Sequence, residues 1–183
     1  SRSTIDANAA NTGGGVSANS GTINLHTVTV SGNTATNGGA VATAGTGAME
    51  ITSSTITRNT TNAAVNPGAI RTGGTGAITV TNTIVANQVA GGACGSTLQL
   101  SGGHNLYDQS GCFVAPGTGD VVVAAGPVGL GALAMNGGFA PTHMVPASAA
   151  LIVNTGSPSC SGPDQRGFPR PRGSACEKGA IER

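Results

Sequence analysis

The sequence predicts an all-β protein: a right-handed parallel β-helix with a disulfide-stapled irregular C-terminal region. Three observations predict this fold: a composition that disfavours helices, short runs in which apolar and polar residues alternate, and a repeat of 25–29 residues. Gly accounts for 31 of the 183 residues, whereas charged residues make up 8% and aromatic residues 2% of the chain. Because Gly, Thr, Asn and Ser have low helix propensities, this composition leaves either disorder or a β architecture with tight turns.

The regular placement of apolar residues argues against disorder. Apolar residues alternate with polar ones in the segments Ile23-Asn24-Leu25, Val28-Thr29-Val30, Met49-Glu50-Ile51 and Ile78-Thr79-Val80. A period of two is typical of half-buried strands. Strands of about three residues are too short for an ordinary hairpin sheet, so we expect them to pair between successive coils of a solenoid.

Two sequence markers recur with the same drifting period. The first is an Asn that closes a Ser/Thr-rich apolar segment, with spacings of 25, 26 and 28 residues: Asn8, Asn33, Asn59 and Asn87. The second is a Gly-rich turn that runs into a small apolar pair, with spacings of 25, 29 and 24 residues, and it ends at Val16, Val41, Ile70 and Cys94. The repeat contains no helical segment, so it predicts a parallel β-helix with three short strands per coil. We place coils in residues 1–93, and the last coil or coils and a cap region in residues 94–183.

The recurrent Asn residues predict an internal amide ladder. Each side chain would bond the copies in the coils above and below, as in other stacks of parallel strands. Such a ladder also fixes the register, because a slip of one residue turns every inward side chain outward. Asn59 additionally begins the sequence Asn59-Thr60-Thr61, a possible N-glycosylation site. Burial in the ladder and glycosylation are alternative interpretations of this residue.

Four cysteines lie in the C-terminal half and form two local pairs. Cys94 and Cys112 bracket one segment, and Cys160 and Cys176 bracket another. Three connectivities are formally possible, and we expect the two local disulfides. A zinc site is the alternative for four cysteines, but the sequence has no CxxC motif. Disulfides predict an oxidising compartment, and therefore an extracellular or cell-surface protein.

The chain begins within a coil, since residues 3–8 match the last third of the repeat. We therefore expect unpaired strand edges in the first coil, and such edges recruit partners unless charged residues block them. Residues 1–60 contain only four charged residues: Arg2, Asp6, Glu50 and Arg58.

The C-terminal sequence resembles the choice-of-anchor Q domain family of bacterial proteins. The resemblance rests on residues 164–171 (DQRGFPRP), on Gly179-Ala180-Ile181-Glu182, and on residues 131–138 (GALAMNGG) followed by Pro141-Thr142-His143. It implies a secreted or surface protein with a right-handed parallel β-helix and no catalytic chemistry. Glu177-Lys178 replaces the Asp-Ile that is common after the last Cys of the family. Because the chain ends one residue after the Gly-Ala-Ile-Glu motif, we expect this copy to carry no means of attachment to the cell.

Residues 121–135 are apolar but are interrupted by three glycines and a proline. A membrane helix needs about 20 residues. We therefore expect no membrane insertion, and an extended segment that lies along the β-helix and covers an open face.

Candidate catalytic and metal-binding groups do not form a recognisable site. Glycoside hydrolysis requires two carboxylates about 5–9.5 Å apart. None of the seven acidic residues forms an i, i+2 pair on a strand: Asp6, Glu50, Asp108, Asp120, Asp164, Glu177 and Glu182. The three histidines, His26, His104 and His143, lack metal-binding or nucleophile motifs. We therefore predict no enzyme, no catalytic residue, no cofactor and no metal site.

The charges narrow the choice of partner. A net charge of +1 with a single Lys argues against binding to nucleic acid. Basic residues gather near the C-terminus: Arg166, Arg170, Arg172, Lys178 and Arg183. They would either bind an acidic surface or glycan, or pair locally with Asp164, Glu177 and Glu182.

Together these observations predict a non-catalytic extracellular structural protein. The chain would be a subunit that self-assembles head-to-tail through its β-helix ends into a fibre or surface layer. The alternative is a cell-surface adhesin or carbohydrate-binding β-helix that presents rows of Thr, Asn and Ser to a glycan. A polysaccharide lyase or glycosidase is the third hypothesis.

Overall fold

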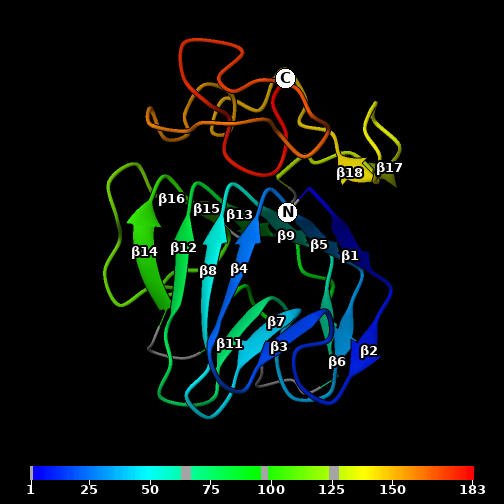
Figure 1. Cartoon of the computed structure of the whole chain (residues 1–183), viewed down its shortest axis with the longest axis vertical. Coiled ribbons are helices and arrows are strands. Elements are labelled where there is room, and N and C mark those ends of the chain that lie inside the picture. The colour runs from blue at the N-terminus through cyan, green and yellow to red at the C-terminus, as the bar shows by residue number, and fades with distance from the viewer. Residues whose placement is uncertain (1, 63–66, 96–98, 124–127) are drawn as a thin grey trace.

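The computed structural model describes residues 2–62, 67–95, 99–123 and 128–183. In these residues the protein is all-β, and its parallel strands stack as a β-solenoid of about four turns (Figure 1). The described residues contain no helix. The predicted fold class is therefore confirmed.

Two large parallel sheets form two sides of the solenoid. The first, which we call the covered sheet, contains β1 (Thr4–Asp6), β5 (Thr29–Ser31), β9 (Thr55–Thr57), β13 (Ile84–Ala86), β15 (Leu106–Tyr107) and β16 (Val121–Val122). The second, which we call the open sheet, contains β4 (Thr22–His26), β8 (Ala48–Thr52), β12 (Ile78–Thr81) and β14 (Gln99–Gly103).

Two smaller parallel sheets complete the cross-section. One contains β2 (Ala9–Ala10), β6 (Thr34–Ala35) and β10 (Thr60–Thr61), and the other contains β3 (Val16–Ala18), β7 (Val41–Thr43) and β11 (Ile70–Thr72). A complete coil therefore holds four strands, and the prediction of three was wrong. The additional two-residue strand directly follows the ladder Asn, where the chain turns between two sides of the solenoid.

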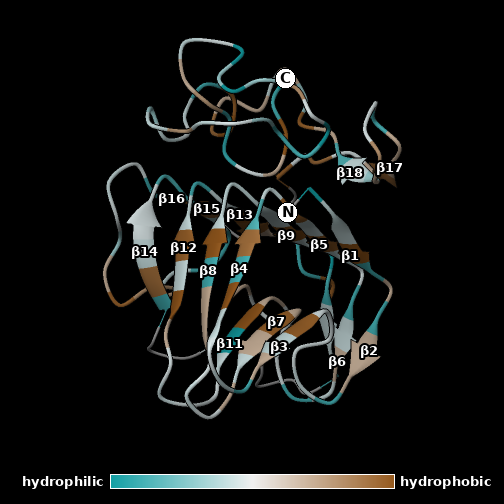
Figure 2. Cartoon of the chain, viewed as in Figure 1, coloured by the Kyte–Doolittle hydropathy of each residue, from teal (hydrophilic) through white to brown (hydrophobic). Residues whose placement is uncertain are grey.

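The predicted repeat register is present in the strand pairing. Val16 pairs with Val41, Val41 pairs with Ile70, and Ile70 forms a parallel bridge with Cys94. These residues point into the solenoid and belong to its hydrophobic core. Because each inward position is filled by a stack of similar aliphatic residues, the core continues from coil to coil; Figure 2 shows the apolar residues of the strands in brown.

The corners on either side of the covered sheet use left-handed backbone conformations. Thr27, Ser53, Asn82 and His104 occupy one corner with φ values of 50°, 48°, 50° and 57°. The opposite corner holds Ala7, Gly32, Arg58 and Asn87, with φ values of 56°, 68°, 58° and 58°. Only one of these eight residues is Gly, although left-handed backbone is unfavourable for other residues. The corners are therefore held by the surrounding hydrogen bonds and packing more than by glycine.

Residues 128–183 form a mostly irregular segment, which we call the flank. It lies outside the covered sheet and contains one short antiparallel pair, β17 (Leu133–Ala134) with β18 (Thr142–His143) (Figure 1). The flank was predicted as a cap region, but it covers a side of the solenoid. This position explains why β5, β9 and β13 are buried throughout.

The apolar run 121–135 belongs partly to the solenoid and partly to the flank. Val121 and Val122 form β16, the last strand of the covered sheet, and Leu130 belongs to the core between that sheet and the flank. Residues 124–127 lie outside the described residues. The prediction of a segment that covers a sheet face therefore holds for the part of the run around Leu130, whereas Val121 and Val122 belong to the sheet itself.

Candidate functional site

Asn8, Asn33 and Asn59 form a hydrogen-bonded ladder, as their spacing predicts. The Oδ1 atom of Asn33 accepts hydrogen bonds from the backbone N–H and the Nδ2 of Asn8, at 3.1 and 3.0 Å. The Oδ1 atom of Asn59 accepts the same two groups of Asn33, at 3.0 and 3.1 Å. Asn33 and Asn59 are fully buried. The ladder therefore satisfies polar groups inside the solenoid at a corner where the backbone turns.

The fourth member of the ladder is Gln88, and the prediction of Asn87 was wrong. The Oε1 atom of Gln88 accepts hydrogen bonds from the backbone N–H and the Nδ2 of Asn59, at 3.0 and 3.3 Å. The strand register explains this assignment, because Ile84 pairs with Thr55 and so places Gln88 beside Asn59.

Asn87 occupies the corner position before the ladder. Its Oδ1 accepts the backbone N–H of Val128 at 2.9 Å, and its own backbone N–H donates to Asp108 Oδ2 at 2.6 Å. Asn87 therefore links the solenoid to the flank.

A second ladder, which the sequence analysis missed, lies at the opposite corner of the covered sheet. In each step a side-chain oxygen accepts the backbone N–H of the equivalent residue one coil earlier, at distances from 2.8 to 3.2 Å. The residues that accept are Ser54, Thr83, Asn105 and Asp120. Four different residue types fill one position, so no self-similarity marks this ladder in the sequence.

The structure contradicts glycosylation of Asn59 in the folded protein. Its side chain is fully buried, and its Nδ2 donates to the carbonyl oxygens of Val30 and Thr57 at 3.1 and 2.9 Å. A glycan on this nitrogen would have no space and would remove these hydrogen bonds.

The N-terminal end of the solenoid is open. β1, β2, β3 and β4 each form the edge of their sheet. Three inward residues of this coil are only partly buried although they pack against the core: Ile5, Val16 and Ile23. Asn8 is exposed, and among the described residues nothing donates to its Oδ1. This end therefore combines unpaired main-chain edges, apolar side chains and a ladder acceptor.

The C-terminal end of the solenoid is closed by residues 108–120, which we call the lid. Cys112 of the lid forms a disulfide with Cys94, and the two Cα atoms are 5.1 Å apart. The ring of Phe113 packs edge-on against Tyr107, with ring centres 5.0 Å apart, and both are buried. The lid therefore covers the last inward side chains of the core.

The lid also covers main-chain groups at this end. The side chain of Gln109 accepts the backbone N–H of Cys94 and donates to its carbonyl oxygen, at 3.3 and 3.0 Å. The backbone N–H of Val114 donates to the carbonyl of Gln99 in β14 at 3.0 Å. The lid therefore occupies main-chain groups of Cys94 and Gln99 that a further coil would use, whereas β16 forms the edge of the covered sheet at this end.

The flank binds the covered sheet through polar contacts in the early coils. Thr29 Oγ1 donates to Gln165 Oε1 at 2.6 Å, and Gln165 Nε2 donates to Thr4 Oγ1 at 2.8 Å. Ser31 Oγ and His143 Nε2 are hydrogen-bonded at 2.9 Å. Burial lowers the pKa of His143, and Arg58 lowers it further, against the raising effect of the hydrogen bond to Gly131.

In the later coils the same interface is apolar. Outward-facing residues of β13 and β15 and side chains of the flank share a second core, formed by Ile84, Ala86, Leu106, Leu130, Val145, Ile152, Ala180 and Ile181. The change from polar to apolar contacts follows the outward positions of the sheet, which are Thr4, Thr29 and Thr55 in the first coils and Ile84 and Leu106 later.

Asp164 organises the turn that carries the DQRGFPRP sequence. Its Oδ1 accepts the backbone N–H groups of Arg166 and Phe168 at 2.8 and 3.0 Å. Its Oδ2 accepts the Arg166 guanidinium at 2.9 Å and the backbone N–H of Glu182 at 2.8 Å. Because both oxygens are fully used and Asp164 is buried, the arrangement is structural.

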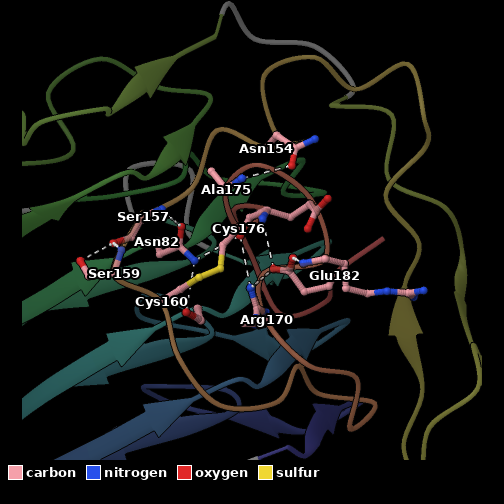
Figure 3. Close-up of a disulfide and its surroundings, with 12 residues drawn as sticks. Asn82, Asn154, Ser157, Ser159, Cys160, Arg170, Ala175, Cys176 and Glu182 are labelled. Atoms are coloured by element: carbon pink, nitrogen blue, oxygen red, sulfur yellow. Dashed lines mark hydrogen bonds and ion pairs between the residues drawn. A yellow bond between two sulfur atoms is a disulfide. The ribbon is translucent and has the colours of Figure 1, made fainter.

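A second buried cluster joins Arg170, Glu177 and Glu182 next to the Cys160–Cys176 disulfide (Figure 3). Arg170 Nη1 lies 2.7 Å from Glu182 Oε1, which also accepts the backbone N–H of Glu177 at 3.1 Å. Burial, together with a hydrogen bond to Glu177, raises the pKa of Glu182 to about 8, while Arg170 acts in the opposite direction.

The basic C-terminal residues have divided roles. Arg170 and Lys178 are buried, and Lys178 Nζ donates to the carbonyl oxygen and to the Oγ1 of Thr155. Burial lowers the pKa of Lys178. Arg172 and Arg183 are exposed. Local pairing thus accounts for part of the predicted basic segment.

The acidic residues do not form a glycosidase-like pair. Asp6 lies on β1 of the covered sheet and Glu50 on β8 of the open sheet, and Asp120 is engaged in the second ladder. In the part of the chain that the structure describes, no group of three or more His, Cys, Asp or Glu residues could hold a metal ion. The imidazole of His143 is buried between the flank and the covered sheet, where it contacts Ser31.

No family model, curated protein or solved structure matches this chain. The resemblance to the choice-of-anchor Q family therefore remains a prediction from residues 131–143 and 164–182.

The two disulfides indicate an oxidising compartment. Over the described ranges there is no helix of the length and hydrophobicity that a membrane span needs.

Proposed function

We propose that this chain is a non-catalytic extracellular structural protein that self-associates through the N-terminal end of its solenoid. The observation that carries the proposal is the set of edge strands β1, β2, β3 and β4, which in the described part of the chain lie at one end of the solenoid together with three apolar side chains. Exposed strand edges bind further strands unless they are blocked.

The open end repeats a surface that the protein already uses internally. At each inner junction, parallel strands pair in register, Val16 stacks on Val41, and an amide oxygen accepts two N–H groups from the next copy. A coil from a second molecule would meet equivalent groups. Continuing this parallel interface requires head-to-tail contact. Two N-terminal ends related by a two-fold axis would pair their edge strands antiparallel and would use the main-chain edges and apolar side chains without the ladder.

The covered C-terminal end decides between a head-to-tail fibre and a dimer. Head-to-tail growth into a fibre requires the C-terminal end to accept a coil, and the lid with its Cys94–Cys112 disulfide covers that end. The geometry favours contact between the N-terminal ends of two molecules, which closes a dimer. A filament remains the prediction from the sequence, and it requires displacement of the lid.

The extracellular location is supported by the two disulfides, and the structural role by the arrangement of polar side chains. The side chains of the two ladders form hydrogen bonds with backbone groups or with each other. Asp164 pairs with Arg166, and Glu182 pairs with Arg170. The adhesin hypothesis, based on rows of Thr, Asn and Ser, has no comparable site on the open sheet.

Sedimentation velocity of the disulfide-intact protein over a wide concentration range tests the proposal. We expect concentration-dependent association that Val16→Lys abolishes, because this substitution places a charge at the open end. The matched control is Val114→Lys, since Val114 is 65% exposed on the lid at the opposite end. A protein that stays monomeric at the highest concentration contradicts the proposal, and so does association that Val114→Lys blocks and Val16→Lys does not. Long polymers would restore the head-to-tail assembly and contradict the dimer.

A further inference from the structure

The aromatic residues of this chain are few and unevenly placed. Of three Phe and one Tyr, Phe113 and Tyr107 pack together beneath the lid. The other two lie on the flank and are exposed, Phe139 at 96% and Phe168 at 38%. The flank thus exposes half of the aromatic residues of a chain that otherwise buries them.

The loop that carries Phe139 is held in place by its neighbours. Asn136 Nδ2 donates to the carbonyl oxygen and the Oγ1 of Thr142, at 2.8 and 3.1 Å, which closes the loop between β17 and β18. Arg166 Nη1 donates to the carbonyl oxygen of Asn136 at 3.4 Å. Gly138 approaches Arg166 so closely that a Cβ atom would lie 2.8 Å from the Arg166 Cα. Phe139 is therefore presented to solvent by a fixed backbone.

Guanidinium groups surround the adjacent Phe168. The Cζ atoms of Arg166 and Arg172 lie 4.8 and 5.2 Å from the centre of its ring. Arg2 Nη1 lies 3.6 Å from the place that a Cβ on Gly167 would occupy. The Phe139 loop joins this group, because a Cβ on Gly137 would lie 4.0 Å from Phe168 Cε2. The Arg166 side chain is only 6% exposed and is bonded to Asp164, so it does not face a ligand. We call the other four residues, Arg2, Phe139, Phe168 and Arg172, the aromatic–arginine surface.

The three carboxylates of the flank are buried, so they do not lie beside the exposed positive charges of this surface. Asp164, Glu177 and Glu182 are 0%, 2% and 0% exposed. Asp164 pairs with Arg166 from beneath, whereas Arg172 has no ion pair among the described residues. Asp6 of β1 is the exposed carboxylate of the first coil. The exterior of the flank is consequently positive, while its interior holds the negative charges.

We propose that the aromatic–arginine surface binds an anionic polysaccharide. An exposed aromatic ring offers the C–H face of a sugar an apolar stacking partner. Guanidinium groups recognise carboxylates through charge-assisted, often paired hydrogen bonds. A nucleic acid would require more cations than a chain of net charge +1 supplies. Phe139, Phe168 and Arg172 of this surface lie on the flank, and Arg2 directly precedes β1. The surface does not include the edge strands themselves, so its function does not depend on the proposed self-association.

Isothermal titration calorimetry with polygalacturonate fragments tests the inference, with dextran as the uncharged control polymer. We expect saturable binding to polygalacturonate that weakens with added salt, and none to dextran. Phe139→Ala and Arg172→Gln should each weaken binding roughly tenfold, as expected for central contact residues. Both side chains are exposed, so the thermal midpoint of unfolding should not change.

Val89→Ala is the matched control, because Val89 is 70% exposed on the solenoid and away from the flank. Its affinity should equal that of the unsubstituted protein. Absence of binding to polygalacturonate overturns the inference, as does binding that neither Phe139→Ala nor Arg172→Gln weakens. Binding to phosphatidylglycerol vesicles without binding to polygalacturonate would assign the surface to lipid and would also overturn it.

Discussion

The side-chain oxygen of Asn59 accepts both the backbone N–H and the side-chain amide of Asn33, at 3.0 and 3.1 Å. This relationship recurs from coil to coil and couples the register of each coil to the next. It combines two requirements of a solenoid, since it satisfies buried backbone at a corner and distinguishes the correct register from slipped ones.

Asn59→Ala should lower the free energy of unfolding by about 1–3 kcal/mol, because buried groups of Asn33, Val30 and Thr57 lose their partner. Chemical denaturation measures this change. Asn8→Ala is the control, since Asn8 is exposed at the open end, and we expect a much smaller effect. Equal losses of unfolding free energy in Asn59→Ala and Asn8→Ala would contradict a stabilising role of the buried ladder.

Stability should fall as the pH rises from about 5 to 8, because burial raises the pKa of Glu182. The pKa of Glu182 is about 8 in the folded protein, against an ordinary value of 4.5. Between these values the folded state binds more protons than the unfolded state, so the free energy of unfolding decreases with pH.

Thermal unfolding of Glu177→Gln measured across this pH range tests the assignment. The substitution removes a hydrogen bond and a negative charge that raise the pKa of Glu182, while the effect of burial remains, so the pH dependence should become shallower. Glu50→Gln, at an exposed position on β8, should retain the original slope. A slope that Glu177→Gln leaves unchanged would show that other groups cause the pH dependence.

Replacing both Cys94 and Cys112 by Ser should cost about 2–4 kcal/mol of stability and loosen the lid selectively. Peptide-level hydrogen exchange should show faster exchange in residues 108–120, while β5, β6 and β7 keep their protection. Uniform loss of protection along the solenoid would mean that the disulfide supports the whole fold and not the closed end in particular.

Gln165→Ala should weaken the attachment of the flank, because the buried hydroxyl of Thr29 loses its acceptor. We expect a cost of about 1–3 kcal/mol and faster cleavage within residues 128–183 during limited proteolysis. Ser148→Ala, an exposed flank position, should leave the cleavage rate unchanged. A Gln165→Ala protein as resistant as the original would show that the apolar contacts alone hold the flank.

The sequence predicts the fold class and much of the register because Val16, Val41, Ile70 and Cys94 are chemically similar and directly visible as a repeat. The sequence repeat places the fourth ladder residue at Asn87, because an Asn is expected there. The ladder position is occupied by the next residue, Gln88, which is of a different type. The second ladder is not visible in the sequence because Ser54, Thr83, Asn105 and Asp120 share only a side-chain oxygen.

The candidate site could be predicted only in part. Unpaired edges in the first coil follow from the mid-coil repeat, but the closed opposite end does not, since the repeat fades where the lid begins. The pair Cys94 and Cys112 was the sequence signal for the lid. A disulfide between them holds the segment around Cys112 against Cys94, the last residue of the second repeat marker. The position of Phe139 depends on the contacts of Asn136 and Arg166, which are distant in sequence.

Hydrogen exchange of the native, disulfide-intact protein at low and high concentration tests whether the molecules associate through the edge strands β1–β4. We expect association to add protection in residues 4–26, which contain these four strands, and none in residues 99–114. Added protection in residues 99–114, or no change anywhere at concentrations where the protein associates, would contradict it.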